Sequence, residues 1–196
     1  AEPFANKIRK NDRIIGMFVP GKKEQLKLSQ YADDTESINA DVSSVIETLG
    51  EFKKFEKATG CALNADKTKG LMVLGSQSEL TKEEIQKLIP DISWEDGIKV
   101  LGIYFLLDQK HMQDFNWTQV IDTLKKDTKL LPSRQLSLKG KVTLLNSITL
   151  AQIWYLSSLI VIPKWALKKI EKICFTFLWG EGCPEPIKRD TIYLPL

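Results

Sequence analysis

The sequence predicts an α+β fold in which a mixed amino-terminal part is followed by an all-helical part. Short apolar runs bounded by turn residues recur as far as Phe105, which is the pattern of strands. One strongly amphipathic helix interrupts them at residues 41–59. After Phe105 every periodic stretch has helical spacing. We therefore expect two domains, residues 1–110 and 111–196.

In the first part strands alternate with helices, and the strands are expected to form an antiparallel sheet. Residues 2–8 are expected to be the tail of a helix. The strands are expected at 14–19, 26–31, 36–39, 70–74 and 98–105, and a short helix at 81–89. Helix 41–59 starts at Asp41 or at a capping box of Ser44 and Glu47, and Gly60 ends it. Its apolar face is expected to contain Val42, Val45, Ile46, Leu49, Phe52 and Phe55.

In the second part three helices are expected, at residues 117–131, 136–162 and 164–179, and prolines end the first two. Residues 142–163 contain no charged side chain and approach the length of a membrane span. Polar residues such as Asn146 and Gln152 interrupt the stretch, and lysines flank it. The interpretation that we favour is a buried helix of a helical domain, with no association with a membrane.

Charge is distributed unevenly along the chain. Residues 1–117 carry 16 Lys and Arg against 19 Asp and Glu, whereas residues 118–179 carry 10 against 3. Such an excess suits a polyanionic partner, although lysines that merely solvate helix surfaces give the same count. The single His and the three widely spaced Cys argue against a structural zinc site or a disulfide framework, and they suit a reducing compartment.

Two adjacent aspartates, Asp33 and Asp34, follow Tyr31 and Ala32 at the tip of the hairpin expected between strands 26–31 and 36–39. Neighbouring carboxylates repel each other unless a positive charge lies nearby. A solvated turn explains the pair, and so does a divalent metal ion, because hard cations prefer carboxylate oxygen ligands. Polymerases hold two such ions for phosphoryl transfer.

The order of the motifs resembles the reverse transcriptases of LINE-type non-LTR retrotransposons over nearly the whole chain. The sequence YADD resembles their motif C in the palm, and it is followed by a helix and then by GCALNADKTKGLMVLG and VLGIYF. Gly60, Asn64, Lys67 and Thr68 match motif D, and Leu101 with Gly102 matches the primer grip of motif E. The basic stretch from Leu136 to Trp179 resembles the thumb.

The resemblance implies an RNA-directed DNA polymerase, a nucleotidyltransferase that uses two Mg²⁺ ions, with Mn²⁺ as an alternative. Asp33 and Asp34 would bind the metal ions, and Lys67 would act at the triphosphate. Tyr31, Ala32, Leu101 and Gly102 would lie near the primer and the nucleotide. The residues expected to bind nucleic acid are Arg134, Lys139, Lys141, Lys164, Lys168, Lys169 and Lys172.

The implied partners are an RNA template, a DNA primer, the RNA–DNA hybrid, dNTPs and the upstream reverse transcriptase domains. The implied location is intracellular, in a nuclear and cytoplasmic ribonucleoprotein. Trp165 and Trp179 could stack on bases, but core packing is the interpretation that we favour. Motifs A and B, which supply a further carboxylate and the nucleotide-binding helix, lack counterparts here. We therefore expect a fragment without polymerase activity; a catalytically inactive nucleic-acid-binding remnant is the alternative.

Overall fold

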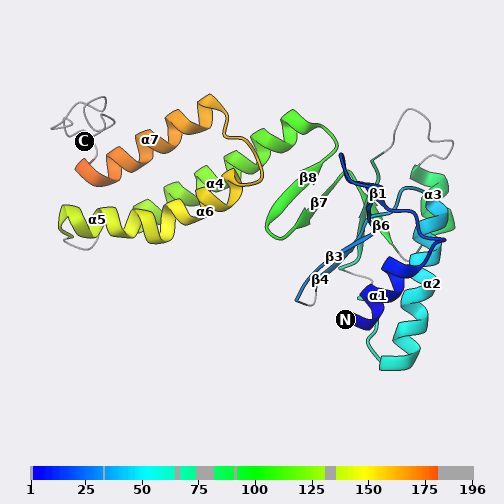
Figure 1. The fold of residues 1–196 in the computed structure, drawn as a ribbon. Helices are drawn as coiled ribbons and strands as arrows, with labels where there is room; N and C mark the ends of the chain where they lie inside the picture. The colour runs from blue at the N-terminus through cyan, green and yellow to red at the C-terminus, as the bar shows by residue number, and fades with distance from the viewer. Residues whose placement is uncertain are drawn as a thin grey trace. The chain divides into compact units, whose positions relative to one another are not determined.

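The computed structural model describes residues 2–32, 34–64, 67–73, 82–90, 92–130 and 136–180. The chain divides into two compact units, Ala1–Glu95 and Asp96–Leu196 (Figure 1). Short strands, paired mostly antiparallel, alternate with helices in unit 1, and unit 2 is largely helical. The α+β class predicted from the sequence is confirmed.

Helices α1 (Glu2–Lys10) and α2 (Val42–Thr59) pack against each other in unit 1. The ring of Phe4 lies 5.4 Å from the ring of Phe52 and 5.5 Å from that of Phe55. Further along, the side chain of Asn11 donates to Glu47 at 3.2 Å. The two helices therefore run antiparallel, and they enclose a core of Phe4, Ala5, Ile8, Ile14 and Leu28.

The ends of α2 agree with its sequence signals. The carboxylate of Asp41 accepts a hydrogen bond from the backbone N–H of Ser44 at 2.7 Å, so Asp41 is the N-cap. This hydrogen bond is the main reason why the pKa of Asp41 is lowered. Gly60 ends the helix with a φ of 74°, in the left-handed region.

The apolar face predicted for α2 is correct except at Ile46, which is exposed. The most buried side chains of the helix are instead polar: Ser44, Thr48 and Glu51. Their face lies against other segments of unit 1 that need polar partners. Ser44 accepts from the N–H of Ile15 at 2.8 Å, and Thr48 donates to Asn39 at 3.0 Å.

The strands of unit 1 form three pairs among the described residues. Strands β1 (Met17–Phe18) and β2 (Gln25–Leu26) are antiparallel, as are β3 (Leu28–Tyr31) and β4 (Asp34–Ser37). Strands β5 (Lys69–Leu71) and β6 (Ser93–Glu95) are parallel, which departs from the expected all-antiparallel sheet. Helix α3 (Lys82–Leu88) lies between them in sequence, as a parallel connection requires. Ile85, Ile89 and Ile92 form a second core beneath α2.

Unit 2 begins with a hairpin of β7 (Gly97–Val100) and β8 (Ile103–Leu106). The expected single strand at 98–105 is therefore wrong, because the chain reverses at Leu101 and Gly102. The side chain of Asn116 fastens the hairpin to α4 (Gln109–Leu130) by accepting from the N–H of Tyr104 at 2.9 Å and donating to its carbonyl at 2.7 Å. The hairpin thus belongs to unit 2, which begins at Asp96.

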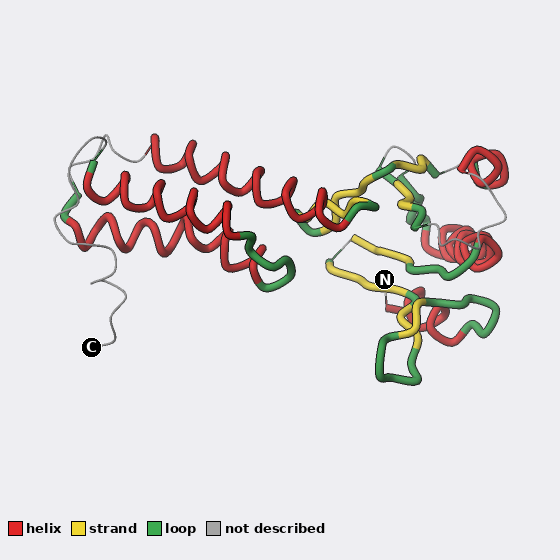
Figure 2. The backbone as a smooth tube through the Cα atoms, turned by 90° about the horizontal axis from the view of Figure 1, so that it is seen from above, coloured by secondary structure: helices red, strands yellow, loops and turns green. Residues whose placement is uncertain are grey.

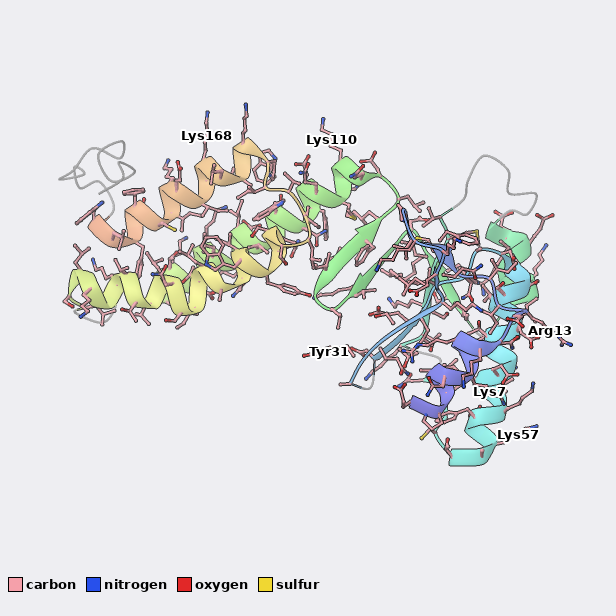
Figure 3. The ribbon with its side chains drawn as sticks, in the orientation of Figure 1. Lys7, Arg13, Tyr31, Lys57, Lys110 and Lys168 are labelled. Carbon is pink, nitrogen blue, oxygen red and sulfur yellow. The ribbon has the colours of Figure 1, made fainter. Side chains whose placement is uncertain are left out.

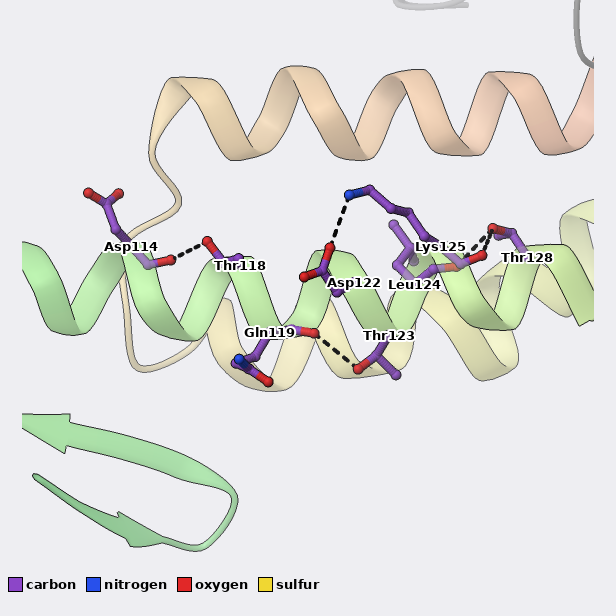
Figure 4. Close-up of polar contacts among 8 residues, drawn as sticks. All are labelled: Asp114, Thr118, Gln119, Asp122, Thr123, Leu124, Lys125 and Thr128. Carbon is purple, nitrogen blue, oxygen red and sulfur yellow. Dashed lines mark hydrogen bonds and ion pairs between the residues drawn. The ribbon is translucent and has the colours of Figure 1, made fainter.

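Helix α4 is rich in threonine, a residue that disfavours helices. Thr118, Thr123 and Thr128 each donate their hydroxyl to the carbonyl four residues earlier, at 2.7–3.0 Å (Figure 4). This local hydrogen bond lets Thr128 be buried without an unpaired hydroxyl. The core of unit 2 is centred on the fully buried Trp117, whose indole N–H donates to the carbonyl of Val161 at 3.0 Å.

Three helical segments lie beside one another along unit 2 (Figure 2). The expected helix at 136–162 is interrupted: α5 (Leu138–Leu144) passes through a π-helical turn, η1 (Leu145–Thr149), into α6 (Leu150–Ser157). Helix α7 (Lys164–Trp179) has the predicted bounds. Within the described ranges, no helix has the length and apolarity that crossing a membrane requires.

Hydrogen bonds set the direction of these helices. Trp165 donates to the carboxylate of Asp114 at 2.8 Å, which joins the beginnings of α7 and α4. The ammonium of Lys141 donates to the carbonyl of Leu178 at 2.8 Å, which joins the beginning of α5 to the end of α7. Helices α4 and α7 therefore run in the same direction, and α5–η1–α6 returns between them in sequence in the opposite direction (Figure 1).

Candidate functional site

The aspartate turn connects β3 and β4. Tyr31 pairs with Asp34 in the antiparallel register, so the connection consists of Ala32 and Asp33 alone. Ala32 has a φ of 55°, a left-handed value that costs a residue with a β-carbon about 1–2 kcal/mol. Buried Leu28 anchors the base of the hairpin, and a 3.0 Å hydrogen bond from Gln30 to Thr35 crosses it. The expected hairpin is confirmed; Asp33 itself lies outside the described residues.

Asp34 is the first residue of β4, and its side chain is exposed, as is that of Tyr31. Within the described part of the chain, Asp34 has no hydrogen-bond or ion-pair partner. An exposed, unpaired carboxylate at a short turn is a suitable ligand for Mg²⁺. No group of three or more potential metal ligands occurs among the described residues, which do not include Asp33.

The turn after α2 is built around Asn64. The backbone N–H of Lys67 donates to the side chain of Asn64 at 3.2 Å, and Thr68 donates its hydroxyl to the carbonyl of Asn64 at 2.7 Å. These bonds hold Lys67 in a turn with its side chain exposed. Asn64, Lys67 and Thr68 therefore share one local turn. No hydrogen bond or ion pair joins Lys67 to Asp34 in the described ranges.

The second turn of interest lies at Leu101 and Gly102. Val100 pairs with Ile103, so these two residues form the whole connection between β7 and β8. Their φ values are 47° and 86°, the pattern of a type I′ turn. Such turns favour Asn–Gly, and Leu at the first position is strained. Among the described residues, Ala32 and Leu101 are the two non-glycine residues with a positive φ.

The basic residues of α7 differ in how free they are. Lys164, Lys168 and Lys172 are exposed and recur every four residues, so they form one stripe on the helix. Lys168 points away from α4 and α6 (Figure 3). Lys169 lies over the ring of Trp165, with its ammonium 4.8 Å from the ring centre. Such a contact leaves the lysine at the surface but shields that tryptophan face.

The remaining predicted cations have varied environments. Lys139 is exposed at the beginning of α5, whereas Lys141 is half-buried and bonded to the end of α7. A lysine at that position interacts favourably with the partial negative charge of the helix terminus, which gives it a structural role. Arg134 lies outside the described residues.

Trp165 and Trp179, the two tryptophans considered for base stacking, are both partly buried. Trp165 is half-buried against the core of unit 2 and is hydrogen-bonded to Asp114. The indole nitrogen of Trp179 is also buried. Core packing is therefore the better description of both residues.

Two residues of unit 2 escaped the sequence analysis. Lys110, in the first turn of α4, is exposed and points to the same side as Lys168 (Figure 3). Lys110 precedes the basic stretch 118–179, so the uneven charge distribution does not single it out. Tyr155 on α6 donates its hydroxyl to the carbonyl of Leu101 at 2.6 Å. No sequence pattern connects residues so far apart in the chain.

Comparison with known proteins finds one informative relative and no matching family model. The "Transposon TX1 uncharacterized 149 kDa protein" of Xenopus laevis is 26% identical to this chain over 182 residues. The aligned region covers 91% of this chain and 13% of that protein, so the chain spans a small part of its relative. The chain is therefore distantly related to a protein of a transposable element.

Proposed function

We propose that this chain is the carboxyl-terminal part of the palm and the thumb of a non-LTR retrotransposon reverse transcriptase. In its full-length parent it would take part in RNA-directed DNA synthesis, with RNA as the template, a DNA primer and dNTPs as substrates. Its own contribution would be one carboxylate turn and a surface that binds the RNA–DNA hybrid. Such a protein would act in a nuclear and cytoplasmic ribonucleoprotein, together with the upstream reverse transcriptase domains.

The observation that supports this proposal most strongly is the position of the two strained turns. Ala32 and Leu101 are the non-glycine residues with positive φ in the described chain, and each stands in a motif that the resemblance singles out. Backbone strain of this kind persists where function requires a particular geometry. The relationship to a transposon protein was found independently of that geometry.

Asp33 and Asp34 are the residues that would hold the Mg²⁺ ions in this proposal. The chemistry of Asp34 fits, since it is an exposed carboxylate without a described partner. The ions would neutralise charge on the phosphates and activate the attacking hydroxyl. This chain supplies no counterpart of motif A, so the isolated chain should bind nucleic acid without extending a primer.

The alternative is a nucleic-acid-binding remnant of such an element that has lost catalysis altogether. Both versions require unit 2 to bind the hybrid through its lysines, and they differ only in the full-length protein. In the full-length protein, primer extension that depends on Asp33 would favour the polymerase. Extension below detection with every divalent metal ion tested would favour the remnant.

Filter binding of an RNA–DNA hybrid across a salt series tests the feature that both versions share. Four exposed lysines, Lys139, Lys164, Lys168 and Lys172, are candidates for phosphate contacts. If each contacts one phosphate, the logarithm of the binding constant should fall with the logarithm of salt concentration with a slope of about −3 to −4. Affinity should not depend on base sequence, because phosphate contacts carry no sequence information.

Changing Lys168, Lys169 and Lys172 together to Glu removes two of these four candidates, so it should flatten the slope by about 2 and weaken binding equally for all sequences. A matched control changes Lys22, Lys23 and Lys57, three exposed lysines of unit 1, to Glu, which gives the same change in net charge. The control should leave the slope nearly unchanged. A slope near zero for the unmodified chain, or an equal loss in the control, would contradict the proposal.

A further inference from the structure

Two side chains from the helices of unit 2 form hydrogen bonds to the β7–β8 hairpin, in addition to the packing of its buried Ile103 in the core. Asn116 of α4 holds its middle through both backbone groups of Tyr104, and it is itself fully bonded because it also donates to Met112 at 2.8 Å. Tyr155 of α6 holds its tip through the carbonyl of Leu101 at 2.6 Å. The two attachments come from different helices.

The hydrogen bond from Tyr155 at the tip is a more unusual contact than those from Asn116 in the middle. Asn116 is buried, and a buried polar side chain that satisfies strand groups is ordinary packing. Tyr155 has 47% of its surface exposed and Leu101 has 43%. Ile103, next to the turn, is buried in the core of unit 2, but its packing does not set the direction of the Leu101 carbonyl. The hydroxyl hydrogen bond is therefore the specific link between α6 and the tip.

Backbone strain at Leu101 makes the hydrogen bond from Tyr155 important for the conformation of the turn. A two-residue turn with Leu at a φ of 47° is disfavoured, so the free hairpin would relax toward other turn conformations. A hydrogen bond to the carbonyl of Leu101 fixes the orientation of that peptide group. By holding this strained peptide group in place, Tyr155 affects any molecule that contacts the turn.

We propose that Tyr155 is a positioning residue, whose hydroxyl sets the orientation of the Leu101–Gly102 turn so that the turn can receive the primer end of the RNA–DNA hybrid. The inference rests on the proposed function, which assigns the turn to the primer. Tyr155 need not touch the nucleic acid. Its effect passes through the carbonyl of Leu101.

The test compares Tyr155→Phe with Tyr104→Phe in the same 196-residue chain. Both substitutions remove one phenolic hydroxyl. The hydroxyl of Tyr104 has no hydrogen-bond partner in the described ranges, although its ring packs on Phe115. Hydrogen exchange of the segment from Val100 to Ile103 reports the turn. Loss of one such hydrogen bond should speed exchange there about three- to tenfold in Tyr155→Phe and leave it unchanged in Tyr104→Phe.

A second measurement links the turn to the primer. A hybrid with a photoreactive group at the primer 3′ end is crosslinked to the chain, and the crosslinked peptide is identified by mass spectrometry. Tyr155→Phe should lower crosslinking to the peptide containing Leu101 at least threefold while the hybrid dissociation constant changes less than twofold. Replacing Leu101 by Asn, which adopts positive φ more readily, should restore crosslinking in the Tyr155→Phe background.

The outcomes separate the two proposals. Unchanged exchange in Tyr155→Phe overturns the positioning role, as does faster exchange with unchanged crosslinking. If the unmodified chain does not bind the hybrid, the proposed function fails instead, and the assignment of the turn to a primer fails with it. If the unmodified chain binds but its primer end crosslinks elsewhere, the positioning role is overturned and hybrid binding stands.

Discussion

The buried carboxylate of Glu51 should make the stability of unit 1 depend on pH. Glu51 lies on α2, with 5% of its surface exposed, and it bridges α2 to α1. Its oxygens lie 2.6 Å from the ammonium of Lys54 and 2.8 Å from that of Lys7 on α1. Both lysines keep more than half of their side chains in water.

These contacts lower the pKa of Glu51, first through the hydrogen bond from Lys54 and then through that from Lys7, against the opposing effect of burial. A carboxyl group whose folded pKa is depressed stabilises the fold at pH values above its unfolded pKa, for which the ordinary value is 4.5. That contribution is lost as the pH falls through the folded pKa, which lies below 4.5. The contribution of Glu51 to stability should therefore be constant from pH 6 to 8 and decrease below pH 4.5.

Replacing Glu51 by Gln keeps the shape and removes the charge. A charge-assisted hydrogen bond contributes about 1.5–3 kcal/mol when it is buried, but solvent screens the exposed lysines and exposed pairs contribute less than about 1 kcal/mol. Removing both contacts should therefore lower the free energy of unfolding by about 1–2 kcal/mol. Both lysines remain hydrated in the variant, so no buried charge is left unpaired. For a unit of this size, the midpoint of thermal unfolding should fall by about 5–15 °C.

Thermal or urea unfolding, followed by circular dichroism between pH 3.5 and 8, measures this effect. The matched control is Glu56→Gln, on the same helix, because Glu56 has no side-chain partner within the described ranges. The difference between Glu51→Gln and the unmodified chain should shrink as the pH drops below 4.5. The reasoning is refuted if Glu51→Gln is no more destabilising than Glu56→Gln, or if the difference persists unchanged at pH 3.5.

Three further outcomes are expected. In the full-length parent, Asp33→Asn should reduce dNTP incorporation by more than tenfold while RNA binding is nearly unchanged, because a metal ligand acts locally. Primer extension within tenfold of the parent would contradict the assignment of Asp33 as a metal ligand. Asn116→Leu should lower the free energy of unfolding of unit 2 by about 2–4 kcal/mol, because both backbone groups of Tyr104 lose their buried hydrogen-bond partner. Urea unfolding measures this loss, and a value under about 1 kcal/mol would show that water replaces the Asn116 side chain. Burial raises the pKa of the Cys174 thiol, so at pH 8 iodoacetamide should alkylate the exposed Cys61 at least tenfold faster than Cys174. Peptide mass spectrometry measures the two rates, and equal rates would mean that α7 opens readily.

Local signals in the sequence were sufficient to predict many helices and turns of this protein. Asp41 and Gly60 mark the ends of α2 because capping depends on residues within one turn of the helix. Pro163 and Gly180 likewise enclose α7. The hairpin at the aspartate pair was predictable because polar residues separate two alternating runs. These features need only neighbours in the chain, and the sequence states them directly.

Features that depend on distant partners were decided by the tertiary structure. The run at 98–105 was expected to be one strand, because Leu is a poor residue for a positive-φ turn; contacts from Tyr155 and Asn116 accompany the reversal there. The polar face of α2 is more buried than much of its apolar face, because Ser44 and Glu51 meet groups from other segments of unit 1. Lys141 was counted among the nucleic-acid contacts, yet it holds the end of α7. A periodicity records which residues share a face, but only the packed chain determines what that face meets.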